Sequence, residues 1–163
     1  GQCTRSVQGR NRLKLTKRNY SQRQVTWAKE EGADFIMGET FGTLDEAKLA
    51  LEAIKKHAPG LPAVITFAGG KWNGPGVEQD CTHDGVPRVE ACMELLKLGA
   101  DVVGINCTCG PKVTEIVMKR LRERAGPDAL LAAIPGPYRT TMDHPFFFNF
   151  KNPDTGIRID KNE

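Results

Sequence analysis

Four short apolar runs recur along the chain, and each follows a segment with the apolar spacing of an amphipathic helix. The runs cover residues 34–38, 63–67, 101–106 and 129–134. Their apolar residues are continuous rather than alternating, which is typical of strands in a parallel sheet whose two faces are both covered. Strands that alternate with helices in this way predict an α/β fold, in which right-handed crossovers place each helix outside the sheet.

The intervening segments carry the signals that start and stop helices. Ser21 and Thr43 each open a capping-box pattern, in which a Ser or Thr is followed three residues later by Gln or Glu. Glycine follows the last apolar position of two segments, and Pro59 and Gly126 mark the ends of the other two. We therefore predict helices over residues 21–31, 43–58, 86–98 and 113–124.

Composition and charge exclude several classes of protein. The 163 residues are 39% hydrophobic and 26% charged, and no apolar stretch approaches the roughly 18 residues that a membrane-spanning helix needs. Six Lys/Arg and no acidic residue fall within residues 1–18, which leaves 17 basic against 20 acidic residues in the rest. A basic leader (residues 1–19) thus precedes a slightly acidic body, and we expect neither a nucleic-acid nor a membrane partner. Because the chain begins at Gly1 rather than Met, we interpret it as a partial chain or one that has lost a segment.

Two α/β architectures fit these units. A spacing of roughly 30 residues per unit suits a (β/α)8 TIM barrel, but a complete barrel has about 250 residues and this chain supplies four clear units. An open, doubly wound sheet of the flavodoxin type fits the length better, although no glycine-rich phosphate fingerprint follows any of the runs. In both architectures the chemistry gathers where the strands end and the following loops begin.

Polar side chains occupy these strand ends, and the most informative are Glu39, Asn106 and Cys107. A carboxylate at the end of an apolar strand is costly to bury without a partner. Two interpretations of Glu39 stay open at this point. It is either an anchor for a substrate ammonium group, or a base, or else a structural carboxylate that accepts hydrogen bonds from loop amides.

The five cysteines form an odd set in a chain that otherwise has the pattern of an intracellular α/β protein. We therefore expect reduced thiols and a cytoplasmic location. Cys107 and Cys109 form a single Cys-x-Cys pattern, a weak indication of a metal because free cysteines are often small buried apolar residues. The place of Cys107 at a strand end favours a metal approached from solvent. Because no HExxH or CxxC pattern occurs, the chain alone does not present a complete zinc site.

Two further segments are interpreted from their length and composition. Residues 69–85 form a Gly-rich loop of about 17 residues, which is typical of a lid or a binding loop. Trp72 in this loop either stacks against a ligand or covers the end of the sheet. Residues 139–163 have no clear period, and we interpret them as a loop or extension.

Several motifs, taken together, resemble the homocysteine S-methyltransferase family. This family includes betaine–homocysteine methyltransferases and the homocysteine domain of cobalamin-dependent methionine synthase. The motifs are GADFIMGETF at 32–41, DGV at 84–86, GADVVGINC at 99–107 and the Gly-Pro at 110–111. They occur in the family's order over about residues 20–140, and the Gly-Ile-Asn-Cys strand end is the most specific of them.

The resemblance implies a (β/α)8 barrel that binds one zinc ion through three cysteines at the carboxyl ends of its strands. Cys107 matches the first ligand, which ends the sixth strand, and Glu39 matches the fourth-strand glutamate that holds the amino group of homocysteine. Asn106 is expected to support the ligand or to donate a hydrogen bond to the substrate. The family's Cys-Cys pair and its early Asp-Gly strand are absent from this sequence. Residues 20–138 therefore match strands four to seven, and the remaining zinc ligands are expected outside the chain.

The implied function is zinc-dependent methyl transfer to the thiol of homocysteine, which forms methionine, from an onium-type or methyl-cobalamin donor. No catalytic acid or base is assigned, and the implied partners are these small molecules. Betaine-using members typically have Tyr directly after the matched Glu, where this chain has Thr40. Two alternatives stay open: a non-catalytic α/β module that binds a ligand or partner without metal, and a half-barrel that pairs with a second copy through its strand edges.

Overall fold

The computed structural model describes residues 22–69, 71–72, 80–137 and 140. A helix over residues 22–30 comes first in this part of the chain. The elements after it, in chain order, are β1 (Ile36–Phe41), α2 (Leu44–His57), β2 (Ala63–Phe67), β3 (Lys71–Trp72), β4 (Asp80–Cys81), α3 (Arg88–Lys97), β5 (Val102–Asn106), α4 (Pro111–Ala125) and β6 (Leu130–Ile134). The basic leader, residue 21 and, apart from residue 140, the predicted extension over residues 139–163 lie outside the described residues.

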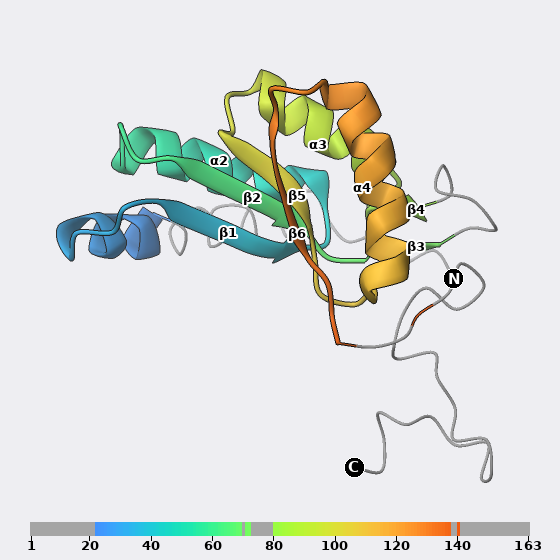
Figure 1. Ribbon diagram of the computed structural model, residues 1–163. Coiled ribbons are helices and arrows are strands. Elements are labelled where there is room, and N and C mark those ends of the chain that lie inside the picture. The colour runs from blue at the N-terminus through green and yellow to red at the C-terminus, as the bar shows by residue number, and fades with distance from the viewer. Residues whose placement is uncertain (1–21, 70, 73–79, 138–139, 141–163) are drawn as a thin grey trace, which may run out of the picture.

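The main sheet has four strands in the order β1-β2-β5-β6, and each neighbouring pair is parallel (Figure 1). The predicted α/β class with a parallel sheet is therefore confirmed. The strand order follows the chain order, whereas a doubly wound sheet reverses its order at the point where ligands bind. Within the described residues there is no such reversal. This topology favours the singly wound arrangement of a barrel over the flavodoxin type.

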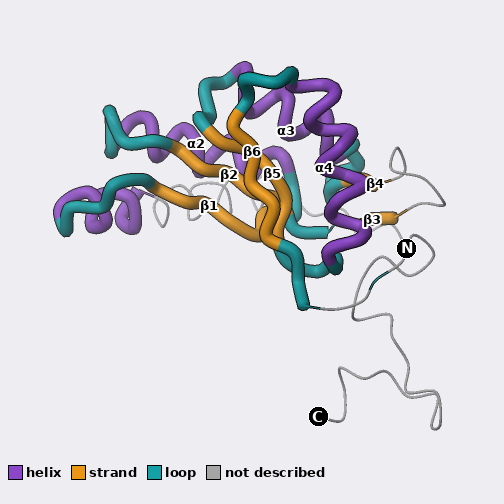
Figure 2. Tube along the Cα trace, in the orientation of Figure 1, coloured by secondary structure: helices purple, strands orange, loops and turns teal. Residues whose placement is uncertain are grey.

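The core lies between the sheet and helices α2, α3 and α4, which Figures 1 and 2 show on the same side of the sheet. Ile65, Phe67 and Val103 from the strands are fully buried against these helices. The opposite face is more open, since Val64 and Val102 are only partly buried and Leu130 is 63% exposed. The prediction that both faces are buried therefore holds only in part for the described residues. Thr66 and Asn106 are buried on this face, whereas its positions nearer the start of the strands are more open and helices α2, α3 and α4 all pack on the other side.

Strand β1 differs most from its predicted bounds, because it begins at Ile36 and continues to Phe41. The apolar run stops at Gly38, so the sequence pattern ended the strand too early. Pairing with β2 continues beyond the run, with Phe41 opposite Phe67 after a register shift. Glu39 is thus inside the last part of the strand rather than beyond its end.

Helix α2 starts as its capping pattern predicts. Thr43 is the N-cap, and its hydroxyl accepts a hydrogen bond from the backbone N–H of Glu46 at 3.3 Å. Acidic residues in the first turn and basic residues in the last complement the helix dipole. The predicted start of α3 is too early and that of α4 too late, because α3 begins after Pro87 and α4 begins at Pro111, where proline is well tolerated.

Strands β5 and β6 approach each other closely at Gly104. A Cβ atom built at this position would overlap the backbone carbonyl of Ala132 on β6. Glycine therefore permits the parallel pairing that carries β5 to its end at Asn106.

The loop after β2 contains a short ladder that the sequence pattern did not reveal. Lys71 pairs with Cys81, and Trp72 pairs with Asp80, to form the antiparallel pair β3–β4. Two residues per strand are too few to show an alternation of apolar and polar residues in the sequence. No helix in the described ranges is long and apolar enough to cross a membrane.

Candidate functional site

The carboxyl ends of the strands form a rim where the backbone is unusually strained. Non-glycine residues with positive φ in the described part of the chain are Thr40 (65°), Cys107 (58°) and Thr108 (44°). All three lie at the ends of β1 and β5. Strain of this kind concentrates at functional sites, where the surrounding structure holds it in place. The rim of the sheet is therefore the candidate functional site.

Cys107 follows β5 directly, and its side chain is exposed to solvent. Its backbone is fixed on both sides, because its N–H donates to the carbonyl of Ile134 at 2.9 Å and its carbonyl accepts from the N–H of Cys109 at 2.5 Å. A solvent-facing thiol on a fixed backbone can serve as a ligand for a metal that enters from outside. The predicted position of Cys107 on the rim agrees with this geometry, and its role as a ligand stays a prediction.

Asn106 is the last residue of β5, and its side chain is 5% exposed. Its Oδ1 accepts one hydrogen bond from the backbone N–H of Thr40 and another from the hydroxyl of Thr66, both at 2.9 Å. Its Nδ2 donates to the hydroxyl of Thr40 at 2.7 Å. One amide thus joins the ends of β1, β2 and β5. Direct contact between Asn106 and a substrate stays a prediction.

Glu39 immediately precedes Thr40 and is exposed. It also lines a cavity of about 620 Å³ that runs along β1 and α2, with Phe35, Met37 and Leu49 among the other lining residues. The carboxylate therefore reaches solvent next to apolar surface, an environment in which it can hold a cation. The alternative role, a carboxylate bound by loop amides, gains no support from its exposure.

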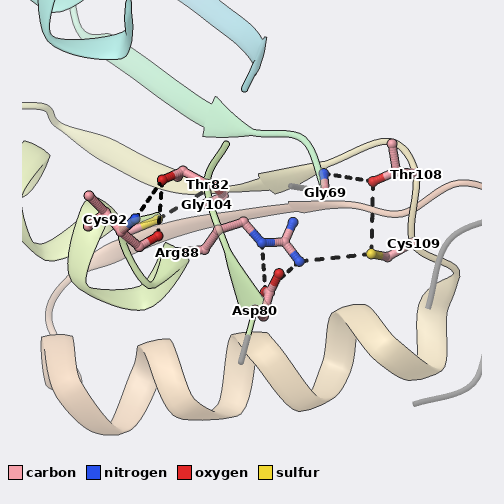
Figure 3. Close-up of polar contacts among 9 residues, drawn as sticks. Gly69, Asp80, Thr82, Arg88, Cys92, Gly104, Thr108 and Cys109 are labelled. Carbon is pink, nitrogen blue, oxygen red and sulfur yellow. Dashed lines mark hydrogen bonds and ion pairs between the residues drawn. The ribbon is translucent and has the colours of Figure 1, made fainter. Parts of the chain in front are cut away.

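The loop after β5 is tied to the loop after β2 and to the residues after β6. The hydroxyl of Thr108 accepts a hydrogen bond from the N–H of Gly69 at 2.7 Å (Figure 3). The carbonyl of Cys109 accepts one from the N–H of Gly136 at 2.8 Å. Cys109 itself is 1% exposed, so its thiol does not face the rim opening as that of Cys107 does. This burial agrees with the small apolar role that is common for free cysteines.

Behind this loop lies a buried ion pair that the sequence pattern did not indicate (Figure 3). Arg88 donates from Nε to Asp80 Oδ2 at 2.6 Å, and both side chains are 1% exposed. Arg88 also donates from Nη2 to the sulfur of Cys109 at 3.9 Å. Burial raises the pKa of Asp80 although the attraction of Arg88 opposes this rise. Burial also acts to lower the pKa of Arg88, but the contacts with Asp80 and Cys109 outweigh it, and the net pKa of Arg88 is raised.

Asp84 joins the loop before α3 to the start of α2. Its carboxylate accepts hydrogen bonds from the N–H groups of Leu44, at 3.1 and 3.2 Å, and of Asp45, at 3.4 Å. Partial burial raises the pKa of Asp84, but hydrogen bonds from Thr82, Leu44 and Asp45 outweigh burial, and the net pKa is lowered. Asp84 therefore caps α2 from a distant part of the chain.

Replacing Asp84 with Ala is expected to lower the free energy of unfolding by about 1 kcal/mol at neutral pH, the usual effect of losing a helix cap. Because folding lowers this pKa, the stabilisation is fully present above the unfolded-state value of about 4 and is lost as pH falls through the folded-state value. Urea denaturation from neutral pH down to about pH 3 measures both effects. Asp128→Ala, in the turn before β6, is the control, and equal losses in the two variants would contradict the capping role.

The described residues do not by themselves supply a full set of metal ligands. No group of three or more His, Cys, Asp or Glu side chains within the described ranges could hold a metal ion. A catalytic zinc site takes three protein ligands and keeps one position open. Cys107 fits one of these ligands by chemistry and exposure.

Comparison with known proteins connects this chain to one family. The family model described as homocysteine S-methyltransferase matches residues 11–145. Betaine–homocysteine S-methyltransferase 1 of Mus musculus is 36% identical over 114 residues, which are 68% of this chain and 26% of that protein. S-methylmethionine–homocysteine S-methyltransferase of Mus musculus is 28% identical over 123 residues, which are 76% of this chain and 31% of that protein.

A solved structure shows the same fold. The apo form of the homocysteine methyltransferase MmuM from Escherichia coli superposes with a TM-score of 0.58 at 18% identity, over 74% of this chain and 42% of that one. The chain thus spans between a quarter and a half of the proteins that it matches here. The resemblance drawn from the motifs is confirmed, and the chain belongs to the homocysteine S-methyltransferase family.

Proposed function

We propose that the full-length protein transfers a methyl group to the thiol of homocysteine and so forms methionine. We further propose that this chain supplies strands four to seven of a (β/α)8 barrel, as β1, β2, β5 and β6. The observation that carries the function is the pair formed by the exposed carboxylate of Glu39 and the exposed thiol of Cys107. Glu39 precedes Thr40 in the sequence, and Cys107 follows Asn106. Thr40 and Asn106 are hydrogen-bonded to each other, at the edge of the sheet where barrel enzymes bind substrates.

Cys107 is proposed as one of three zinc ligands, with the others outside this chain. A free cysteine-type thiol has a pKa of about 8.5 and is mostly protonated at neutral pH, whereas the thiolate is the nucleophile. Bound zinc would supply the charge that deprotonates the substrate thiol. The backbone of Cys107 is fixed by β6, so its side chain can hold its part of such a site without rearrangement of β5.

Glu39 is proposed to hold the ammonium group of homocysteine. A carboxylate that accepts from a charged donor makes a stronger bond than a neutral acceptor does, and it fixes the direction of the substrate as well. With the amino group held at β1 and the sulfur near Cys107 at β5, the substrate would lie across the rim. The sulfur lone pair then attacks the methyl carbon of the donor, and the electron pair of the broken bond leaves with the donor.

The methyl donor is proposed to be an onium compound other than betaine, or methyl-cobalamin. Betaine-using members typically present Tyr where this chain has Thr40. The hydroxyl of Thr40 is hydrogen-bonded to Asn106, and a threonine offers no aromatic face for a quaternary ammonium group.

Substitution of Glu39 by Gln tests the proposed anchor. The full-length wild-type protein is expected to favour homocysteine over 4-mercaptobutanoate, the same thiol acid without the amino group, by between about 10- and 100-fold in kcat/KM. Glu39→Gln should remove most of this preference by raising the KM for homocysteine alone. Initial rates with both thiols provide the measurement.

Glu123→Gln, on the exposed side of α4, is the matched control and should keep the preference. An unchanged preference in Glu39→Gln would show that another group holds the amino group. No methyl transfer to either thiol by the wild-type protein would refute the proposed reaction and leave the non-catalytic module as the better description.

A further inference from the structure

We infer that Thr40 and Asn106 act together as a positioning pair, which sets the place of Glu39 relative to Cys107. The inference rests on the proposed function, because it assigns a purpose to the geometry between the proposed anchor and the proposed ligand. Along the chain, Glu39 is joined to Thr40 and Asn106 is joined to Cys107. The hydrogen bonds between Thr40 and Asn106 close the path across the sheet.

The contact between the two residues has two points of attachment. The N–H of Thr40 donates to Asn106 Oδ1 at 2.9 Å, and Asn106 Nδ2 donates to the hydroxyl of Thr40 at 2.7 Å. Two bonds between one residue and one planar amide fix its orientation as well as its distance. The hydroxyl of Thr66 donates to the same amide from β2, and Asn106 is 5% exposed, so the Asn106 side of the contact is held within the sheet although Thr40 is exposed.

The conformation of Thr40 indicates that its side chain is needed. Its φ is 65°, a region that β-branched residues rarely adopt and that glycine adopts freely. A position selected only for this backbone shape would favour glycine or asparagine. Threonine adds a hydroxyl, and that hydroxyl is the acceptor for Asn106.

Thr40 also lies where the pairing of β1 is irregular. The register of β1 against β2 shifts between Gly38 and Phe41, and Thr40 lies within this shift. Glu39 is exposed within this irregular stretch, and Phe41 returns to pairing with Phe67. Asn106 therefore holds β1 in the conformation that it has at the register shift, and Glu39 lies within that shift.

Two substitutions of Thr40 in the full-length protein separate a positioning role from a structural one. Thr40→Gly relieves the backbone strain but removes the hydroxyl, whereas Thr40→Ser keeps the hydroxyl and removes only the methyl group. We expect Thr40→Gly to keep the wild-type Tm or exceed it, and to raise the KM for homocysteine between about 10- and 100-fold. Thr40→Ser should stay within about 3-fold of wild type, and the KM for the methyl donor should change little in either variant.

A second readout needs no activity. Hydrogen exchange at the amide of residue 40 should be slow in the wild-type protein and in Thr40→Ser, and faster in Asn106→Ala, which lacks the acceptor. A KM for homocysteine in Thr40→Gly that stays at the wild-type value would overturn the inference. An equal rise of this KM in Thr40→Ser would overturn it as well. If the wild-type protein does not methylate homocysteine at all, the proposed function fails, and fast exchange at residue 40 in that protein would separately overturn the pairing.

Discussion

Cys107→Ala in the full-length protein is expected to abolish stoichiometric zinc binding and to reduce methyl transfer at least about 100-fold, because a catalytic zinc site loses one of only three protein ligands. The fold should remain, since the side chain of Cys107 is exposed and its removal leaves no cavity. The change in unfolding free energy of the metal-free protein should stay within about 0.5 kcal/mol. Metal analysis, initial rates and urea denaturation of the metal-free form give the three measurements.

Cys92→Ala is the matched control for this experiment. Cys92 is 1% exposed within the core, so its thiol does not face a metal approached from solvent, and burial raises the pKa of this thiol to about 12. The control should keep zinc and activity while it loses some stability from the core. Retention of zinc and activity in Cys107→Ala would show that the assignment of the ligand is wrong.

Arg88→Met is expected to lower the unfolding free energy by about 3–5 kcal/mol, the range found when one partner of a buried ion pair is removed. The side chain of Asp80 would remain buried without its partner, and the loop after β5 would lose the contact between Arg88 and Cys109. Without the opposing attraction of Arg88, burial would raise the pKa of Asp80 further. The difference in unfolding free energy between Arg88→Met and the wild type should therefore become smaller as pH falls and Asp80 becomes neutral.

A surface ion pair of the same type provides the comparison. Arg124 donates to Glu90 at 3.0 Å, but the two side chains are 58% and 49% exposed. Arg124→Met should cost no more than about 1 kcal/mol, because solvent screens an exposed pair. Chemical denaturation of both variants at neutral pH tests the contrast. Equal losses of unfolding free energy would mean that the buried pair is no more important for stability than the exposed pair. In the double variant Asp80→Asn, Arg88→Met, part of the loss should be regained, since no buried charge is left without a partner.

Much of the fold follows from local pattern. The continuous apolar runs placed β2, β5 and β6 within a residue or so, and the capping residue Thr43 placed the start of α2. These features depend on neighbours in sequence, such as the side chain that caps the first turn of a helix. Cys107 directly follows β5, as its predicted strand-end position requires, whereas Glu39 still lies within β1.

The features that the sequence did not reveal depend on partners far along the chain. Strand β1 continues through polar residues because β2 pairs with it, and no local periodicity marks that extension. Asp80 and Arg88 are eight residues apart on either side of a turn, and nothing in their spacing separates a buried pair from two solvated charges. The capping of α2 by Asp84 spans 40 residues, so a search for caps next to the helix would miss it.

The outer strand β6 has a practical consequence for work with this chain. Leu130 and Ile134 are 63% and 44% exposed, and no described strand lies on the far side of β6. Unpaired backbone N–H and C=O groups next to exposed apolar side chains are a template for aggregation. Residues 22–137 expressed alone would therefore be poorly soluble, and mild detergent or co-expression with the remaining sequence would be the natural remedy.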